Sequence, residues 1–287
     1  MTGTFSWNLL ADIREMWSLP FMLNAFRAGT VAAVLAALVG WFMVLRRQTF
    51  AGHTIAVVGF PGAAGAVWLG TSLSLGYFAF CLAAAAVFAA LPQRGRGSPE
   101  DSAVVGTVQA FALAAGMLFV ALYRGFLNGT NGLLFGSILG ITQAQVLTLA
   151  GFAATVLAVL AVIGRPLLFA SLDADVARAH GVPTRALGAA FLLLLGATAA
   201  EVGQITGAVL VLALLVLPPA TAQLLTPRPA RGLALSVALA LVTVWASLFI
   251  AYYSPYPVGF WLTSIAFGLY ALAFVASRVR APALAVG

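Results

Sequence analysis

Long apolar runs dominate this sequence and restrict it to one class of fold. Of its 287 residues, 63% are hydrophobic and only 7% are charged, whereas soluble domains carry about 25% charged residues. So few charges cannot cover a water-exposed surface, so the chain must lie in a lipid bilayer. The runs lack the alternation of a membrane β-barrel, so the spans must be helical. We predict an all-α, polytopic transmembrane helical bundle that forms one domain over residues 1–287.

Eight or nine membrane spans are predicted. The candidate spans are residues 21–45, 50–69, 72–91, 103–123, 144–163, 186–200, 204–225, 233–252 and 259–275. The segment 186–200 is short and is followed by a break at Glu201, which leaves the count open between eight and nine. Residues 1–20 contain an amphipathic pattern that ends at Pro20, which predicts an N-terminal helix in the membrane interface.

The basic residues indicate an orientation. All fourteen are arginines. If nine spans alternate in direction, all of them except Arg14, Arg27 and Arg124 lie on the same side of the membrane. Cytoplasmic loops carry the excess of basic residues, so we predict that the C-terminus is cytoplasmic. The arginines stand singly or in pairs at span ends, which argues against nucleic acid as a partner. No phosphate-binding loop or hydrolytic motif is present, so we predict that the chain is not an enzyme and that another chain would bind any ATP used.

A charged island at residues 171–183 interrupts the apolar sequence. It contains Asp173, Asp175 and Arg178 around a short Ala-rich segment, followed by Gly181. Such a segment cannot lie in hydrocarbon, so it must face water or another protein. We predict a small cytoplasmic helix across the membrane surface, of the kind that a transporter subunit presents to a soluble motor.

Three polar residues within or beside the spans are candidates for a transport pathway. His53 lies one turn into its span and offers a ring nitrogen to a transition metal, or else bonds a neighbouring carbonyl. Glu201 is an acid between two apolar runs, where a carboxylate is costly and commonly lines a polar path. A turn at residues 200–204 would instead make it an ordinary loop residue. Gln204 is one helical turn further on and could share its face.

Glycines and prolines within the spans predict close helix packing or hinges. Glycine lets two helices approach closely, and proline removes a backbone donor. The consecutive prolines of the 204–225 segment indicate either the end of a helix or a hinge. The residues assigned to packing or hinge roles are Gly52, Pro61, Gly62, Gly65, Gly207, Pro218 and Pro219.

Together these residues resemble the permease subunit of the ATP-binding-cassette importers for zinc and manganese. The resemblance covers nearly the whole chain. It rests on five motifs: residues 44–52, the Pro61-Gly62 pair, and residues 134–140, 173–182 and 207–222. The last two motifs together are the most specific.

The resemblance implies partners and a location. It implies a bacterial cytoplasmic membrane, a second copy of the permease, two ATPase subunits and an extracytoplasmic metal-binding protein. The 171–183 island would then be the segment that couples the permease to the ATPase. No permanently bound cofactor is expected, because the metal is the cargo.

One position departs from the family pattern. The family usually places Asp and His four residues apart on one helix face, and this chain has His53 and Val57 there. An imidazole suits zinc better than the harder manganese ion, so the departure favours zinc as the cargo. Glu201, or His53 of a second copy, could supplement the site.

Two other functions stay open at this point. The missing Asp makes an importer of a metal chelate or a small organic cofactor plausible. A proton-coupled secondary transporter using Glu201 and His53 would predict an inverted repeat, and no convincing one is visible.

Overall fold

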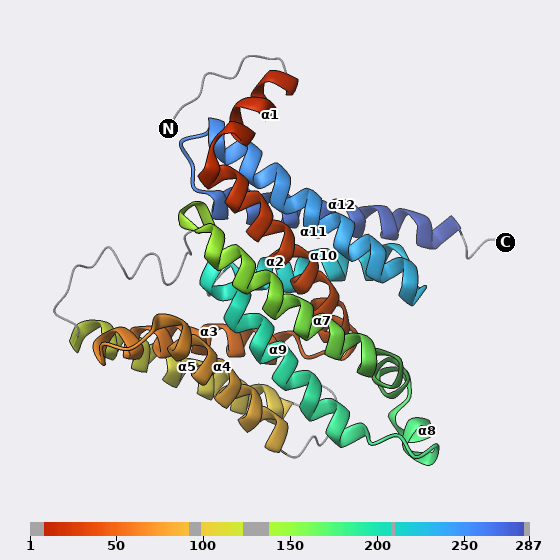
Figure 1. The fold of residues 1–287 in the computed structure, drawn as a ribbon. Coiled ribbons are helices and arrows are strands. Elements are labelled where there is room, and N and C mark those ends of the chain that lie inside the picture. Colours follow the sequence, from red (N-terminus) through yellow and green to blue (C-terminus); the bar gives the residue numbers. More distant parts are fainter. Residues whose placement is uncertain (1–8, 92–98, 123–137, 208–209, 284–287) are drawn as a thin grey trace. The chain divides into compact units, whose positions relative to one another are not determined.

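The computed structural model describes residues 9–91, 99–122, 138–207 and 210–283, and these residues form helices without a strand (Figure 1). The predicted all-α bundle is therefore confirmed. The elements are α1 (Leu9–Ser18), α2 (Pro20–Leu45), α3 (Thr49–Trp68), α4 (Leu73–Ala90), α5 (Pro99–Leu122), η1 (Ile138–Gly140), α7 (Gln143–Leu172), α8 (Ala174–Ala179), α9 (Thr184–Thr206), α10 (Val211–Leu225), α11 (Pro229–Tyr253) and α12 (Val258–Ala283).

Eight helices among the described residues are long and apolar enough to cross a membrane: α2, α3, α4, α5, α7, α9, α11 and α12. A further apolar helix, α10, has only 15 residues, which extend about 22 Å at 1.5 Å per residue. It is therefore shorter than the hydrocarbon core of a bilayer, which is about 30 Å thick. The sequence had placed the short segment at residues 186–200, and that assignment is wrong.

The break predicted at Glu201 is also wrong, because α9 continues through it to Thr206. Glutamate is a good helix former, so one acid does not end a helix. The chain leaves α9 at Gly207, whose φ of 87° suits glycine and few other residues. The next helix accordingly begins at Val211 rather than at Gln204.

Prolines do not end two of the helices. The span predicted over residues 144–163 extends as α7 to Leu172, with Pro166 inside it. Pro218 and Pro219 lie within α10, which continues to Leu225. Of the two alternatives, the end of a helix is therefore wrong, and a hinge stays a prediction. Membrane helices tolerate proline because neighbouring helices, hydroxyl side chains and local adjustments of the backbone satisfy the freed carbonyls.

The chain forms two compact units. Unit 1 contains residues 1–41, 137–150 and 213–287, and unit 2 contains residues 42–136 and 151–212. Unit 2 therefore holds α3, α4, α5, α8, α9 and most of α7, together with the candidate residues from His53 to Gly207.

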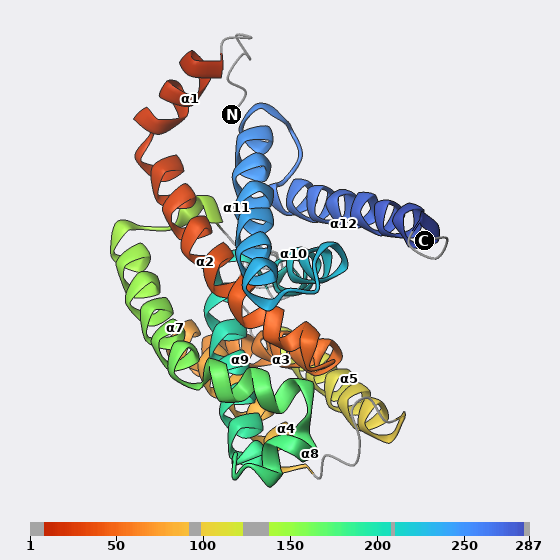
Figure 2. The same cartoon turned by 90° about the vertical axis from the view of Figure 1, so that its right-hand side faces the viewer.

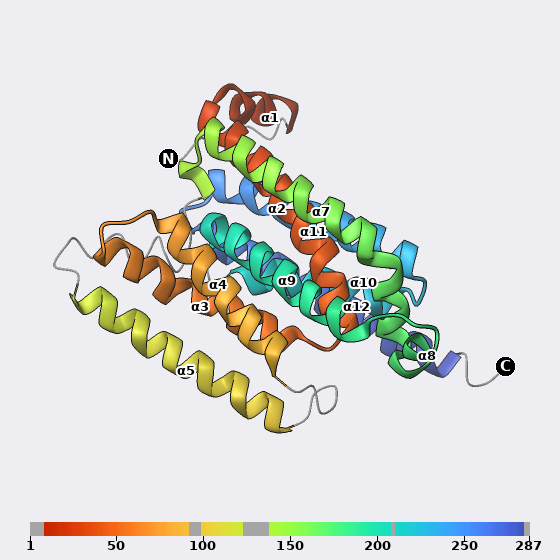
Figure 3. The same cartoon turned by 60° about the horizontal axis from the view of Figure 1, so that its bottom comes forward.

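Helix α3 is the centre of unit 2 and the most buried of the eight candidate spans. It packs against α4, α5 and α9, which lie beside it in Figure 3. Gly62 of α3 and Gly76 of α4 face each other so closely that a side chain on either would meet the other's carbonyl oxygen. Gly65 faces the ring of Phe119, and Gly52 lies against Met43 and Leu195. Small residues thus let the neighbouring helices pack closely around α3.

Unit 1 is built on α2, α10, α11 and α12, with α11 and α12 joined at one end (Figure 2). A side chain at Gly40 of α2 would collide with the carbonyl of Leu215 in α10. The hydroxyl of Ser236 donates to the carbonyl of Ala37, 3.2 Å away. These contacts bring the backbones of α10 and α11 close to α2.

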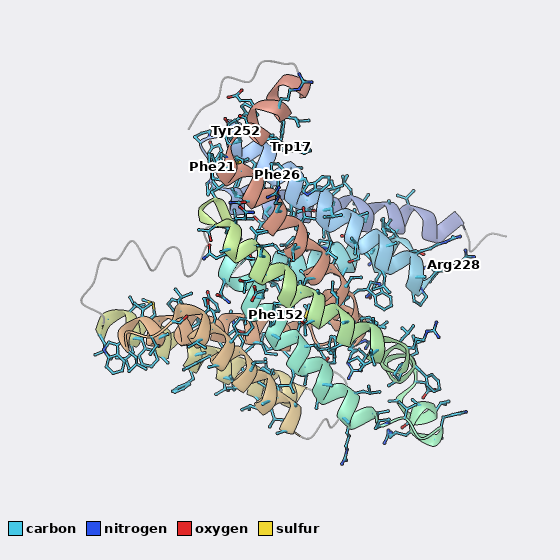
Figure 4. The ribbon with its side chains drawn as sticks, viewed as in Figure 1. Trp17, Phe21, Phe26, Phe152, Arg228 and Tyr252 are labelled. Atoms are coloured by element: carbon cyan, nitrogen blue, oxygen red, sulfur yellow. The ribbon has the colours of Figure 1, made fainter. Side chains whose placement is uncertain are left out.

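Aromatic residues gather at one end of unit 1. Figure 4 shows Trp17, Phe21 and Tyr252 close to one another at the end of α2 and α11, with Arg228 at the opposite end of α11. The Tyr252 hydroxyl donates to Glu15 of α1 at 3.3 Å. An aromatic end and a basic end are the pattern of a span that reaches both membrane surfaces. Residues 1–8 of the predicted N-terminal helix lie outside the described part of the chain.

Candidate functional site

The charged island folds as a capped helix between α7 and α9. Asp173 precedes α8, and its carboxylate accepts hydrogen bonds from the backbone N–H groups of Asp175 and Val176, both at 3.0 Å. This is the N-cap that short polar residues provide to unsatisfied amides. Asp173, Asp175 and Arg178 are all exposed, and Arg178 pairs with Asp175 one turn earlier.

The other end of α8 is closed by Gly181, which has a φ of 78°. Its N–H donates to the carbonyl of Arg178 at 2.9 Å, and the N–H of Val182 donates to the carbonyl of Ala177 at 3.0 Å. His180 packs its ring against Phe169 of α7, with 5.9 Å between ring centroids. A six-residue helix is marginal alone, so these caps and contacts hold it in shape.

His53 lies in the first turns of α3 and is partly exposed. Its Nδ1 atom is buried and has no hydrogen-bond partner among the described residues. The neighbouring Thr54 is fully buried, and its hydroxyl donates to Gln109 of α5 at 3.0 Å. Val57, four residues after His53, is a buried apolar residue. The α3 helix therefore offers one imidazole, and the next residue, Thr54, joins α3 to an amide of α5.

Thr198 of α9 is a second buried polar residue without a partner. Its side chain is fully buried, and its hydroxyl makes no hydrogen bond to the described residues. Elsewhere in these helices a threonine hydroxyl commonly donates to the carbonyl four residues earlier, as in Thr206 and Thr243. An unsatisfied buried hydroxyl is costly, so Thr198 is a candidate to meet water or cargo.

Glu201 and Gln204 lie in the last turns of α9, both partly exposed. The Gln204 amide nitrogen donates to the carbonyl of Ala200 at 3.1 Å, and its oxygen accepts from Ser74 of α4 at 2.5 Å. Gln204 therefore joins the ends of α4 and α9. Glu201 is a helical residue and not part of a turn, so the loop interpretation of this residue is wrong.

His53 and Glu201 are not at the same level of the helix pair. Leu195 of α9 lies against Gly52, the neighbour of His53. Glu201 is six residues beyond Leu195, about 9 Å along the helix axis. No group of three or more His, Cys, Asp or Glu side chains able to hold a metal occurs in the described part of the chain. The single chain thus offers separate polar positions along α3 and α9.

Sequence reasoning missed Thr54, Gln109, Thr198 and Ser74. Gln109 could have been found by the test that singled out Glu201, since it is a polar residue deep in an apolar run. The threonines and Ser74 gave no such signal, because small hydroxyl residues are common in membrane helices. Of the 134–140 motif, residues 134–137 lie outside the described structure, and Ile138–Gly140 form η1.

These features define a multi-pass helical membrane protein with a capped polar helix between two long spans. The profile of the ABC 3 transport family matches residues 18–277, so the chain belongs to this family.

The relatives agree with this assignment. The chain is 28% identical over 267 residues to the manganese transport system membrane protein MntC of Halalkalibacterium halodurans, covering 93% of this chain and 91% of the relative. It is 28% identical to the chelated iron transport system membrane protein YfeC of Yersinia pestis, over 85% of this chain and 82% of that one. The structure of PsaBC from Streptococcus pneumoniae in complex with Fab superposes with a TM-score of 0.82 at 25% identity, covering 93% of this chain and 95% of the other.

Proposed function

We propose that this chain is the membrane-spanning permease of an ABC importer for a divalent first-row transition metal. The observation that carries the proposal is the membership of an ABC transport family over residues 18–277, joined to a capped polar helix suited to dock a motor. Relatives named for manganese and for chelated iron support a metal as cargo.

In this proposal the chain itself performs no chemistry. Two ATPase subunits bind α8 from the cytoplasm, an extracytoplasmic protein delivers the metal, and a second copy of the permease completes the pathway. The C-terminus is cytoplasmic, as the arginines predict. ATP binding and hydrolysis move α8, and the movement changes which side of the membrane the pathway faces. The family membership speaks against the proton-coupled alternative, because an ABC importer takes its energy from ATP.

His53 is the residue that we propose to meet the metal in unit 2. Its buried Nδ1 atom has no partner among the described residues, and a neutral imidazole binds Zn²⁺, Mn²⁺ and Fe²⁺ with different strength. The imidazole favours zinc, whereas the manganese and iron relatives favour those metals. The cargo is therefore a divalent transition metal in this proposal, and a competition assay would identify which one.

A metal chelate is the second candidate cargo. The described residues hold no cluster of three metal-binding side chains, and one relative is named for chelated iron transport. A chelate brings its own ligands, so it would need fewer from the protein.

The test is uptake by the complex reconstituted in vesicles with its ATPase and binding protein. We expect ATP-dependent uptake of radioactive Zn²⁺, Mn²⁺ or Fe²⁺, with unlabelled competitors giving the order of preference. Uptake of a metal chelate but not of the free ions would favour the second candidate. ATP-independent uptake would contradict the importer assignment.

A further inference from the structure

A buried arginine lies where α2 ends and α3 is about to begin. The Arg46 side chain is only 8% exposed. Its Nη1 atom donates to the hydroxyl of Ser171 in α7 at 3.1 Å, and its Nε atom donates to the side-chain oxygen of Gln48 at 3.2 Å. Its guanidinium carbon lies 5.5 Å from the ring centroid of Phe191 in α9. We call Arg46, Gln48, Ser171 and Phe191 the Arg46 cluster.

The aromatic contact is reinforced from α2. Phe42 is one helical turn before Arg46 and also packs against Phe191, with 6.4 Å between ring centroids. The Phe191 ring is fully buried, so the cation lies over its face away from water, where such contacts are strongest. One turn of α2 is therefore fixed against α9.

The cluster also connects to α8. Ser171 lies two residues before Asp173, the N-cap of α8, and its hydroxyl donates to the carbonyl of Leu167 at 2.5 Å. The ring contact between Phe169 and His180 ties the other end of α8 to the same turns of α7. A displacement of α8 must therefore displace the end of α7 that Arg46 holds.

On its other side the cluster connects to α3. Gln48 immediately precedes α3, and its carbonyl accepts from the N–H of Gly52 at 2.9 Å. Arg47, which lies between Arg46 and Gln48, has a φ of 56°, and this makes the connection from α2 to α3 a tight turn. His53 follows Gly52 directly. The cluster thus links α8 to the first turn of α3, the helix that carries His53.

A buried cation is an expensive way to join helices. Taking a guanidinium out of water carries a desolvation cost that an apolar side chain would avoid. Arginine alone combines a planar face for Phe191 with forked donors for Ser171 and Gln48. We propose that Arg46 is a positioning residue that transmits the movement of α8 to α3. The proposal rests on the proposed function, because it needs a motor that moves α8.

Two variants test the link while keeping the helices folded. Arg46→Lys retains the charge but cannot make both donor contacts and the planar stacking at once. Ser171→Ala removes the hydroxyl that accepts from Arg46 Nη1 and leaves the arginine in place. The matched control is Arg47→Asn, which removes an exposed neighbouring charge and tolerates the positive φ.

The measurement is the amount of metal transported per ATP hydrolysed, in vesicles holding the complete complex. For Arg46→Lys and Ser171→Ala we expect this ratio to fall about threefold or more, since residues along a coupling path change coupling by such amounts. ATPase association and ATP hydrolysis should be retained, and Arg47→Asn should keep the original ratio.

Two results would overturn the proposal. An unchanged ratio in both cluster variants would mean that movement passes from α8 to α3 by another route, such as α9. A fall in Arg47→Asn equal to that in the cluster variants would mean that any change at this turn lowers coupling, whether or not the contacts of Arg46 are kept. An unaltered complex that hydrolyses ATP without moving metal would instead disprove the proposed function itself.

Discussion

Two sets of polar side chains in unit 2 differ in whether their hydrogen-bonding groups are satisfied. The Arg46 cluster at the end of α2 is connected to three other segments by hydrogen bonds and a ring contact. Further along, His53 of α3 and Thr198 of α9 each bury an atom that has no partner among the described residues.

The difference indicates which part of unit 2 has a fixed geometry and which part has polar groups free to bind cargo or water. Satisfied buried polar networks fix a geometry, and unsatisfied groups are retained only where something else meets them. We interpret the Arg46 cluster as part of the mechanical connection, and His53 and Thr198 as positions that contact cargo or water. Variants can break this contrast in either direction.

The largest effect is expected for His53→Ala. Loss of a residue that only hydrogen-bonds a metal ligand lowers metal affinity or activity about 10- to 100-fold. For loss of the ligand itself we expect metal uptake to fall about tenfold or more. Membrane insertion and ATPase association should be unchanged. The other histidine, His180, is exposed at the end of α8, so His180→Ala should leave metal binding by the ATP-free complex unchanged. Normal uptake by His53→Ala would remove this residue from the pathway.

A smaller effect is expected at the end of α8. Replacing Gly181 with leucine forces a left-handed backbone on a branched side chain, at a cost of about 1–2 kcal/mol, and should distort the cap. We expect less metal transported per ATP. Gly70 is a matched control, because it has a φ of 69° and, like Gly181, open space around it. Coupling that stays intact in Gly181→Leu, or falls equally in Gly70→Leu, would contradict the docking role.

The smallest effect on uptake is expected for Thr198→Val. Unlike the preceding variants, this one should be more stable than the original protein. Removing an unsatisfied buried hydroxyl relieves a penalty of about 1–3 kcal/mol, so resistance to thermal unfolding in detergent should rise while uptake falls. Thr243→Val is the control, because Thr243 is equally buried but its hydroxyl bonds the carbonyl of Leu239. That variant should not gain stability. A loss of stability in Thr198→Val would show that the hydroxyl is satisfied in the membrane.

Most of the fold could be predicted from the sequence, because membrane-length apolar runs leave few alternatives to helices. The errors came from signals that matter less in a membrane protein than in water. Pro166, Pro218 and Pro219 lie within helices, and the helix around Glu201 is continuous, since Gly207 and not the acid ends it.

The candidate site was less predictable. The polarity of His53 and Glu201 drew attention to α3 and α9, and the charged island predicted α8. The Arg46 cluster could not be foreseen, because it joins residues 125 positions apart. Thr198 carries no sequence signal, since only its missing hydrogen bond distinguishes it from other threonines.

The most direct test of the account is whether α8 touches the motor. Cys81 is fully buried, and no other cysteine is present, so a cysteine placed on α8 would report on its own surroundings. Val176 is 43% exposed, and Val176→Cys can be treated with a short cross-linker in a complex that is active in uptake. We predict a cross-link from α8 to the ATPase subunit. A complex that transports metal while this position forms no cross-link to the ATPase would contradict the assignment of α8 as the docking helix.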